Sequence, residues 1–266
     1  MMNKRVLVNG ACGRMGQEVV KTIVNDTADE LVGVCDKNNE GKDIKKLLSL
    51  PGPEVIIEGD LLSSIKKREV DIIIDFTTPA VVMDNIELGL SNGINMIVGT
   101  TGITEVDLQR IDKLACDNDV AALIIPNFAI GAVLMMRFAA EAAKYLNNVE
   151  IIELHHDQKV DAPSGTAVKT AELINYNRIS NQQNNIDEIE KLPGARGGDS
   201  NGIKIHSVRL PGLIAHQEVI YGTEGQSLTI RHDSYNRKSF MPGVKLALDK
   251  VMGIKGLVYG LEKVLD

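Results

Sequence analysis

Residues 6–16 read VLVNGACGRMG, a short apolar run followed by Gly10, Gly13 and Gly16 at three-residue intervals. An amphipathic stretch follows at residues 17–24. Glycines let a backbone turn tightly and approach a ligand closely, and the free N–H groups at the start of a helix attract phosphate. This stretch predicts a strand, a tight turn and a helix that bind a pyrophosphate, although the same residues would also suit a plain strand-to-helix connection.

Outward from this turn, short runs rich in Val and Ile alternate with amphipathic stretches as far as residue 128. Strands are predicted at residues 6–9, 31–35, 55–58, 71–76, 96–99 and 121–126, with helices between them. Such alternation indicates an α/β fold with a doubly wound parallel sheet, in which ligands collect beyond the carboxyl ends of the strands. A binding site is therefore expected in the loops that follow these strands.

After residue 131 the pattern changes. A helical stretch to about residue 146, a strand at 149–156 and a helix from about 165 precede strands at 203–209, 217–221 and 226–231, which predicts a second, α+β domain with an antiparallel or mixed sheet. Segments 181–185 and 194–202 are rich in Asn, Gln, Gly and charge, and the second predicts a mobile loop. From residue 238 onward the chain again reads as helical and is expected to pack against the first domain.

The composition excludes several classes of protein. The chain has 266 residues, of which 44% are hydrophobic, and a net charge of −7 with scattered Lys and Arg, so it carries no basic footprint for nucleic acid or an anionic membrane. No apolar run approaches the roughly 20 residues that span a bilayer, and no secretory signal opens the chain. Its 3 cysteines stand at unrelated spacings, which suits reduced thiols and a cytoplasmic location.

Two residues after the second predicted strand bear on the choice of cofactor. Asp36 stands about 20 residues beyond Gly16, where a carboxylate accepts hydrogen bonds from an adenosine ribose and favours NADH. Lys37 follows and would pair with the extra phosphate of NADPH, so both cofactors stay open, as does a solvated surface pair. Cys12 lies inside the glycine turn at a helix start, where a thiol pKa can be lowered and oxidation would hinder cofactor binding. A small buried filler residue is the favoured interpretation of this cysteine.

Small polar residues follow two further strands. Residues 76–79 read Phe-Thr-Thr-Pro and residues 99–102 read Gly-Thr-Thr-Gly. Their hydroxyls and exposed backbone groups are placed to line the nicotinamide half of a cofactor that stretches along the sheet edge. Ordinary turn chemistry accounts for the same residues.

The most specific segment is ELHHDQKVDAPSGT at residues 153–166, which places His155, His156 and Lys159 within five residues of an acidic chain. Ser164 is a good helix N-cap, and Gly165 and Thr166 place first-turn N–H donors at the helix start. The helix start can hold one carboxylate, while the His and Lys side chains hold another and supply a proton. The segment therefore predicts a site for a small dicarboxylate.

Other interpretations of this segment remain. A strand-end histidine pair beside a surface lysine would look the same. A metal site formed by His155, His156, Asp157 and Asp161 is disfavoured, because adjacent histidines on a regular strand point to opposite faces. For both histidines to face one pocket, the chain must bend at residues 155–156. No metal is expected.

Taken together, GRMG at 13–16, GTTG at 99–102 and HHxxKxDAPSGT at 155–166 resemble the dihydrodipicolinate reductase family in order and spacing over nearly the whole chain. The resemblance implies a Rossmann dinucleotide-binding domain of residues 1–127 completed by 240–266. It implies a second domain, 128–239, that binds substrate and assembles a homotetramer through its sheet. The implied reaction reduces 4-hydroxy-tetrahydrodipicolinate to tetrahydrodipicolinate with NADH or NADPH, in the diaminopimelate route to lysine.

The resemblance also implies roles for single residues. His155 matches the proposed acid, Lys159 a proton donor and His156 a substrate ligand, while Gly165 and Thr166, beside Ser164, match the residues that hold a substrate carboxylate. The cofactor contacts implied by the resemblance, with Lys37 added for its position, are Gly10, Ala11, Cys12, Gly13, Arg14, Met15, Asp36, Lys37, Gly99, Thr100, Thr101, Ile125, Pro126, Asn127 and Phe128.

Two alternative functions fit the same sequence less well. One is another two-domain oxidoreductase acting on an amino acid or a sugar, although the anion cradle at residues 164–166 disfavours a neutral sugar. The other is a dinucleotide sensor without catalysis, which would have no need of His155 and Lys159.

Many relatives carry an acidic or Glu-Arg pair where this chain has Asp36-Lys37, which leaves the cofactor preference open.

Overall fold

The computed structural model describes residues 3–180 and 189–265. The chain divides into two compact units: unit 1, residues 1–128 with 240–266, and unit 2, residues 129–239. The domain boundary expected between residues 127 and 128 lies one residue from this division. The segment 181–185 lies outside the described residues.

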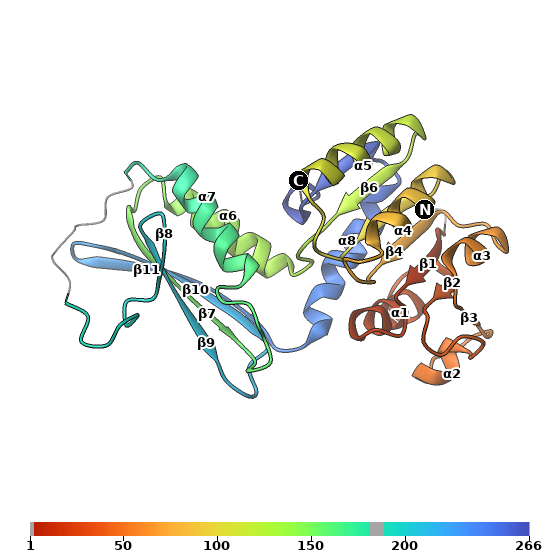
Figure 1. Ribbon diagram of the computed structural model, residues 1–266, viewed down its shortest axis with the longest axis horizontal. Helices are drawn as coiled ribbons and strands as arrows, with labels where there is room; N and C mark the ends of the chain where they lie inside the picture. Colours follow the sequence, from red (N-terminus) through yellow and green to blue (C-terminus); the bar gives the residue numbers. More distant parts are fainter. Residues whose placement is uncertain (1–2, 181–188, 266) are drawn as a thin grey trace. The chain divides into compact units, whose positions relative to one another are not determined.

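Unit 1 is built on a seven-stranded sheet with strand order β12-β6-β5-β4-β1-β2-β3 (Figure 1). All its strand pairs are parallel. The sheet grows from β1 toward β3 and then from β4 in the opposite direction, which confirms the predicted doubly wound fold and places a topological switch point at β1 and β4. Its elements are β1 (Arg5–Asn9), α1 (Arg14–Asp26), β2 (Glu30–Cys35), α2 (Ile44–Leu48), β3 (Ile57–Glu58), α3 (Leu61–Lys66), β4 (Ile72–Asp75), α4 (Val82–Ser91), β5 (Asn95–Val98), α5 (Glu105–Asp117), β6 (Ala121–Ile124), α8 (Met241–Val251) and β12 (Gly256–Tyr259).

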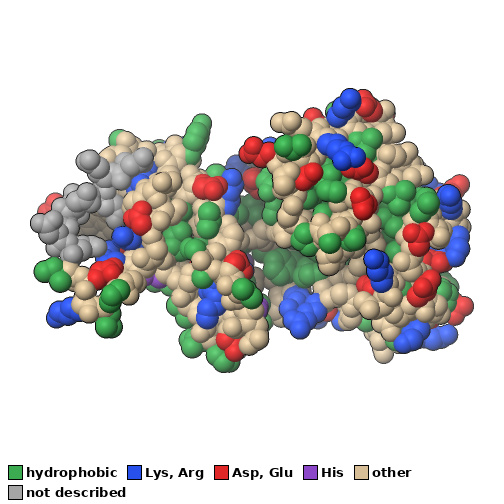
Figure 2. Space-filling model, in the orientation of Figure 1, with side chains coloured by type: hydrophobic (Ala, Val, Ile, Leu, Met, Phe, Trp, Pro, Cys, Tyr) green, Lys and Arg blue, Asp and Glu red, His purple; other side chains and the backbone are tan. Residues whose placement is uncertain are grey.

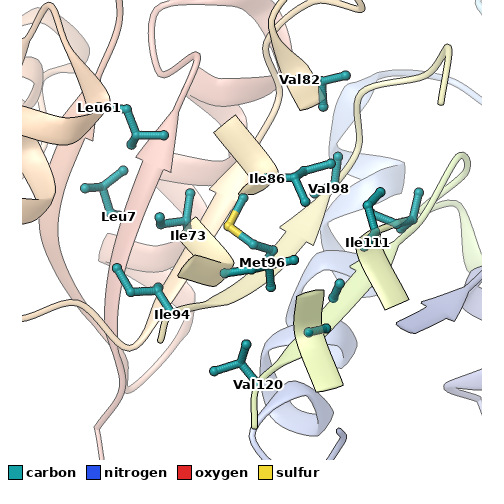
Figure 3. Packing of buried hydrophobic residues seen from close by; sticks show 14 of the residues in the cluster. Leu7, Leu61, Ile73, Val82, Ile86, Ile94, Met96, Val98, Ile111 and Val120 are labelled. Carbon is teal, nitrogen blue, oxygen red and sulfur yellow. The ribbon is translucent and has the colours of Figure 1, made fainter. Parts of the chain in front are cut away.

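The central strands of unit 1 are apolar at nearly every position because both faces of the sheet are covered. All four residues of β4 are buried, as are all four of β6. Met96 of β5 lies among Ile73, Ile86 and Ile94 (Figure 3). Gly89 of α4 makes room for it, since a Cβ there would lie 2.3 Å from the Met96 sulfur. Continuous apolar runs thus became the buried strands that the sequence predicted.

Unit 2 contains a five-stranded mixed sheet with order β11-β10-β7-β9-β8, in which β7 and β9 are parallel and the other pairs antiparallel. Figure 1 shows α6 and α7 side by side against one face of this sheet. Along β7, Val149, Ile151 and Glu153 are buried, alternating with half-exposed residues. The elements are α6 (Ile130–Ala142), β7 (Asn148–His155), α7 (Gly165–Asn177), β8 (Gly198–Ser200), β9 (Ile203–Arg209), β10 (Ala215–Thr223) and β11 (Gln226–Ser234).

Two expectations about secondary structure, one for the C-terminal region and one for residues 194–202, were wrong. The C-terminal region is not helical throughout, because α8 ends at Val251 and residues 256–259 form β12, which pairs with β6. The predicted mobile loop at 194–202 contains β8, which pairs with β9. Asn201 and Gly202, at φ 50° and φ 82°, form the tight turn between those strands, and Asn-Gly favours such hairpins.

In the described ranges 3–180 and 189–265, no helix is both long and apolar enough to cross a membrane. On the face drawn in Figure 2, basic and acidic side chains are interspersed on both units. This pattern agrees with the scattered charges of the sequence.

Candidate active site

The glycine turn after β1 forms a cradle that only glycine can line. Gly10 has φ +78°, and a Cβ there would lie 2.5 Å from the carbonyl oxygen of Phe76. A Cβ on Gly16 would lie 2.1 Å from the Gly10 carbonyl oxygen. Gly13 is the N-cap of α1 and has no side chain to cap the first turn, whose N–H groups lack partners within the helix. The cradle therefore fits the pyrophosphate of a dinucleotide.

Asp36 stands beside this cradle because β2 is the neighbour of β1. Its carboxylate accepts hydrogen bonds from the backbone N–H groups of Cys12 and Asn38, both at 2.8 Å. These bonds fix the carboxylate at the edge of the glycine turn, where an adenosine ribose is expected. Lys37 is exposed.

The thiol of Cys12 contradicts the expectation from its position. Burial raises the pKa of Cys12, and the nearby Asp36 carboxylate raises it further. The Cys12 thiol donates to the carbonyl oxygen of Asn38 at 3.4 Å. The direction of this pKa shift is opposite to the lowered value expected from the helix start, and the causes that raise the pKa are burial first and the Asp36 charge second.

A buried carboxylate that was not among the predicted site residues holds three strand ends together. Asp75, the last residue of β4, is fully buried. Its two oxygens accept hydrogen bonds from the side chains of Asn9, Thr77, Asn85 and Thr100, at 2.7–3.0 Å. The turns after β1, β4 and β5 are thereby fixed to one anchor. The missed signal was an Asp at the end of an all-apolar strand.

The remaining predicted cofactor contacts follow β5 and β6. Gly99 lies against Phe76, since a Cβ there would be 2.1 Å from the ring. Phe76 in turn packs against Phe128 with ring centroids 5.5 Å apart. Exposure varies among the predicted contacts: Arg14, Thr101 and Pro126 are exposed, Met15 and Asn127 are half-buried, and Ala11, Thr100, Ile125 and Phe128 are buried.

The sheet order gives these residues a direction along the edge. Neighbouring strands β6, β5, β4, β1 and β2 end in the turns that carry Pro126, Thr101, Thr77, Gly10 and Asp36, respectively. A dinucleotide with its adenosine at Asp36 would therefore run over the glycine cradle toward the ends of β5 and β6. Ala11, Ile125 and Phe128 are at most 2% exposed, so they support the turns from below and offer almost no surface to a ligand.

In unit 2, the predicted site is organised by Glu153, which is fully buried on β7. One oxygen meets Nδ1 of His155 at 2.5 Å, and both oxygens accept hydrogen bonds from the two terminal nitrogens of Arg209 on β9, at 2.7 and 2.9 Å. Burial raises the pKa of Glu153, but the bonds from His155 and Arg209 outweigh burial and lower it to about 2. Glu153 is therefore a carboxylate at neutral pH.

The two histidines leave β7 differently. His155 is the last residue of β7 and lies on the same face of the strand as Glu153. Because its Nδ1 contacts Glu153, its other ring nitrogen, Nε2, is the one without a partner among the described residues. His156 lies beyond the strand, and its carbonyl oxygen accepts a hydrogen bond from the Lys159 N–H at 3.2 Å. The chain thus bends where the sequence required it to bend. The Lys159 ammonium donates to both oxygens of Asp161, at 2.7 and 2.9 Å.

The predicted carboxylate cradle is the start of α7. Ser164 caps the helix, since its hydroxyl accepts from the Ala167 N–H at 3.2 Å, and its own N–H donates to Glu153 at 3.2 Å. Gly165 is exposed, and a Cβ there would meet nothing within 4 Å. Thr166 is half-buried, and its carbonyl oxygen accepts from the Thr170 hydroxyl. The peptide bond before Pro163 is cis.

Arg209 and Gln217 complete the surroundings of the cradle, and neither was predicted from the sequence. Arg209 also donates to the carbonyl oxygen of Asp161 at 2.8 Å, while its buried Nε has no partner in the part of the chain that the structure describes. Gln217 of β10 donates to the Thr170 hydroxyl at 2.7 Å. Only the alternation of polar with apolar residues along their strands could have signalled them.

The structure therefore brings His155 and Ser164 onto one carboxylate, and it connects the loop of Lys159 to that carboxylate through Arg209. Among residues 3–180 and 189–265, no three His, Cys, Asp or Glu side chains are grouped as metal ligands would be.

Comparisons with known proteins cover the whole chain. Residues 4–128 match the family model "Dihydrodipicolinate reductase, N-terminus", and residues 131–265 match "Dihydrodipicolinate reductase, C-terminus". A 4-hydroxy-tetrahydrodipicolinate reductase of Syntrophomonas wolfei is 51% identical over 98% of both chains. The enzyme of the same name from Bacillus cereus is 50% identical over 100% of both.

Solved structures agree with these matches. Dipicolinate-bound dihydrodipicolinate reductase from Paenisporosarcina sp. TG-14 superposes with a TM-score of 0.88 at 50% identity, covering 98% of this chain and 99% of that one. An amine dehydrogenase from Mycobacterium smegmatis, at 13% identity and a TM-score of 0.67, shares the fold alone. By its family models, its relatives and its fold, this chain belongs to the dihydrodipicolinate reductase family.

Proposed function

We propose that this protein reduces 4-hydroxy-tetrahydrodipicolinate to tetrahydrodipicolinate with NADH or NADPH, in the diaminopimelate route to lysine. The observation that carries the proposal is that one buried carboxylate, Glu153, contacts both His155, the proposed proton donor, and Ser164 at the start of α7, the proposed carboxylate cradle. Relatives that bear the corresponding enzyme name over the full chain support it.

We assign dinucleotide binding to unit 1. The glycine cradle would hold the pyrophosphate through backbone N–H groups, Asp36 the adenosine ribose, and the turns at Gly99–Thr101 and 125–128 the nicotinamide. When bound, the reduced nicotinamide supplies the hydride. Asp36, already fixed by two backbone N–H groups, favours the ribose of NADH, whereas the exposed Lys37 suits the additional phosphate of NADPH.

We assign substrate binding to unit 2. One substrate carboxylate would lie on the N–H groups of Gly165 and Thr166, and the other would take Lys159 and His156 as partners. The pair between Lys159 and Asp161 is exposed on the Asp161 side, and such pairs are worth at most about 1 kcal/mol, so Lys159 can exchange partners at little cost.

The proton inventory of the reaction fits these side chains. Loss of water, addition of a hydride and uptake of one proton convert the substrate to product. His155 is held at Nδ1 by a carboxylate, so Nε2 is the atom that can deliver the proton. Carboxylate contact at the far nitrogen also stabilises the imidazolium form that a general acid requires. Lys159 provides the second donor.

We further propose a cytoplasmic homotetramer assembled through the sheet of unit 2. The helices α6 and α7 cover one face of that sheet, and the opposite face carries Ile152, Leu154 and Ile220, all only half-buried in the single chain. Sedimentation equilibrium should then give about four times the 28.9 kDa of one chain, and a mass of one chain would contradict this assembly.

The assay that tests the function follows reduced-cofactor absorbance when the purified protein meets substrate freshly made from pyruvate and aspartate semialdehyde by the preceding synthase. NADH and NADPH are tested in parallel, with a reaction lacking the synthase as control. Rapid, synthase-dependent oxidation is expected. Absence of oxidation with both cofactors, despite measurable cofactor binding, would favour the sensor or a different oxidoreductase.

A further inference from the structure

Glu153 and Arg209 connect His155, Ser164 and the loop of Lys159, although neither is among the predicted site residues. Glu153 meets Nδ1 of His155 with one oxygen and the Ser164 N–H with the other. Arg209 donates hydrogen bonds to both carboxylate oxygens of Glu153 and to the carbonyl oxygen of Asp161, which lies two residues after Lys159. One ion pair thus fixes the acid, the start of α7 and the loop of Lys159.

The charges around His155 balance when its imidazole is neutral. The carboxylates of Glu153 and Asp161 face the cations of Arg209 and Lys159. Asp157 is exposed and accepts from the Gln158 amide, and Lys169 of α7 pairs with Glu172. Without Arg209, Glu153 beside the helix start would repel an incoming carboxylate. With it, the cradle is close to neutral, and only the imidazoles of His155 and His156 can add positive charge.

A dicarboxylate bound as proposed, at the start of α7 and at Lys159 with His156, would bring two negative charges to the segment that follows His155. The ion at the cradle lowers the free energy of the imidazolium form relative to the neutral form. Because Nδ1 is already held by Glu153, the additional proton has one place to bind, which is Nε2, the position that faces away from the buried pair.

We propose that the Glu153–Arg209 pair is a positioning device that fixes His155 at Nδ1 and leaves the cradle without net charge, so that the bound dicarboxylate draws a solvent proton onto Nε2. Binding of the substrate thereby converts His155 to the imidazolium form that can donate a proton. The step is a simple proton uptake: neutral imidazole and one proton from solvent become imidazolium. The proposal rests on the proposed function for its choice of ligand.

Calorimetry with pyridine-2,6-dicarboxylate, without cofactor and without turnover, measures this uptake. Titrations at about pH 8, where an ordinary histidine is mostly neutral, are run in buffers of different ionisation enthalpy, because the dependence of heat on buffer counts the protons taken up. The full chain should take up between half and one proton per ligand. His155→Ala should remove most of that uptake, whereas His156→Ala, which alters a proposed substrate ligand, should remove the smaller part of it.

Variants of the pair separate charge from geometry. Glu153→Gln should reduce the uptake at least twofold, because the anion that stabilises the imidazolium is gone. Arg209→Lys keeps the charge but loses the fork and the tether to Asp161, so uptake should persist while the ligand binds about 10-fold more weakly. The matched controls are Glu87→Gln and Arg110→Lys, which alter a pair at 2.7 Å between α4 and α5 and should leave both quantities unchanged.

A measurement on the unaltered protein guards against a variant that does not fold. Long-range proton–nitrogen NMR of the imidazole should show the free protein at about pH 8 with His155 protonated at Nδ1. A hydrogen at Nε2 instead, an undiminished uptake in a folded Glu153→Gln protein, or an uptake that depends on His156 alone would overturn the proposal. Absence of any dicarboxylate binding would overturn it too.

The outcomes also distinguish this inference from the function. Proton uptake that depends on His155 and Glu153 in a protein that does not oxidise cofactor would sustain the inference and reject the reductase. Turnover in the reductase assay with no ligand-linked proton uptake would reject the inference alone.

Discussion

The glycine cradle of unit 1 and the His155 site of unit 2, the two proposed anion sites, are built in opposite ways. The cradle depends on absent side chains: Gly10 and Gly16 leave the space clear, and the backbone N–H groups are the proposed donors. The His155 site works through charged side chains that must be held in place, and Glu153 and Arg209 hold them from two different strands. Adjacent residues decide the first site, whereas the second depends on residues 56 positions apart.

This contrast predicts different kinds of failure. Damage to the cradle should weaken cofactor binding and disturb the local packing, because the backbone proposed to bind the cofactor is also tightly packed against neighbouring main-chain atoms. Damage to the His155 site should affect proton transfer and leave the fold of unit 1 intact. Four experiments test this distinction, and they are ordered by the size of the expected effect.

The largest effect is expected from His155→Ala. Loss of a general acid should lower kcat by about two to four orders of magnitude, while the Michaelis constant of the cofactor and the melting temperature stay near their original values. Steady-state kinetics and circular dichroism measure both. Lys159→Ala should lower kcat similarly. Full activity in the His155→Ala protein would show that His155 is not the general acid and that proton transfer does not depend on this site.

Acid should destabilise unit 2 through Glu153. Its pKa in the folded protein is about 2, below the ordinary 4.5, so its stabilisation is complete above about pH 4.5 and is lost as the pH falls toward 2. The difference is on the order of 3 kcal/mol. Urea unfolding between pH 5 and pH 2.5, monitored by hydrogen exchange of β7, should show this loss in the original protein. The same pH range should have a smaller effect on Glu153→Gln.

In unit 1, Gly16→Ala should cost about 2 kcal/mol of unfolding free energy, because the new methyl group meets the Gly10 carbonyl at 2.1 Å. Cofactor binding should weaken at least 10-fold. Gly13→Ala is the comparison for stability: its Cβ would stand 3.2 Å from the same oxygen, so its cost in unfolding free energy should be several times smaller. Equal losses of melting temperature in the two proteins would show that the close approach of Gly16 is not decisive.

The smallest effect concerns the choice of cofactor. Asp36→Ala removes a charged hydrogen-bond acceptor worth on the order of 1.5 kcal/mol, so the Michaelis constant for NADH should rise about 10-fold and that for NADPH less. Lys37→Ala should act in the reverse sense and more weakly, because Lys37 is exposed. A Michaelis constant for NADH that does not change in Asp36→Ala would remove the ribose role of this residue.

Local patterns in the sequence were sufficient for most of the fold. The apolar runs of β1, β2, β4, β5 and β6 are long enough to define buried strands, and the parallel sheet follows from their alternation with helices. The four-residue strand β12 has a similar apolar run, Gly-Leu-Val-Tyr, but it was included in the predicted C-terminal helix. Its pairing with β6, more than 130 positions earlier in the chain, is not a local property. The strand β8 was missed for a different reason, since its polar residues resembled a loop and only the Asn201-Gly202 turn indicated a hairpin.

The sequence by itself determined which candidate functional groups are present and in what order. They are a glycine turn suited to a pyrophosphate, a carboxylate after β2, and two histidines, a lysine and a helix start within one short segment. Each of these is a local property, set by neighbouring residues and by backbone geometry. Only the tertiary structure decided which groups fix them, namely Asp75 beneath three strand ends and the Glu153–Arg209 pair beneath His155. A buried charge persists only when distant donors converge on it, and strand pairing, not proximity along the chain, brings those donors together.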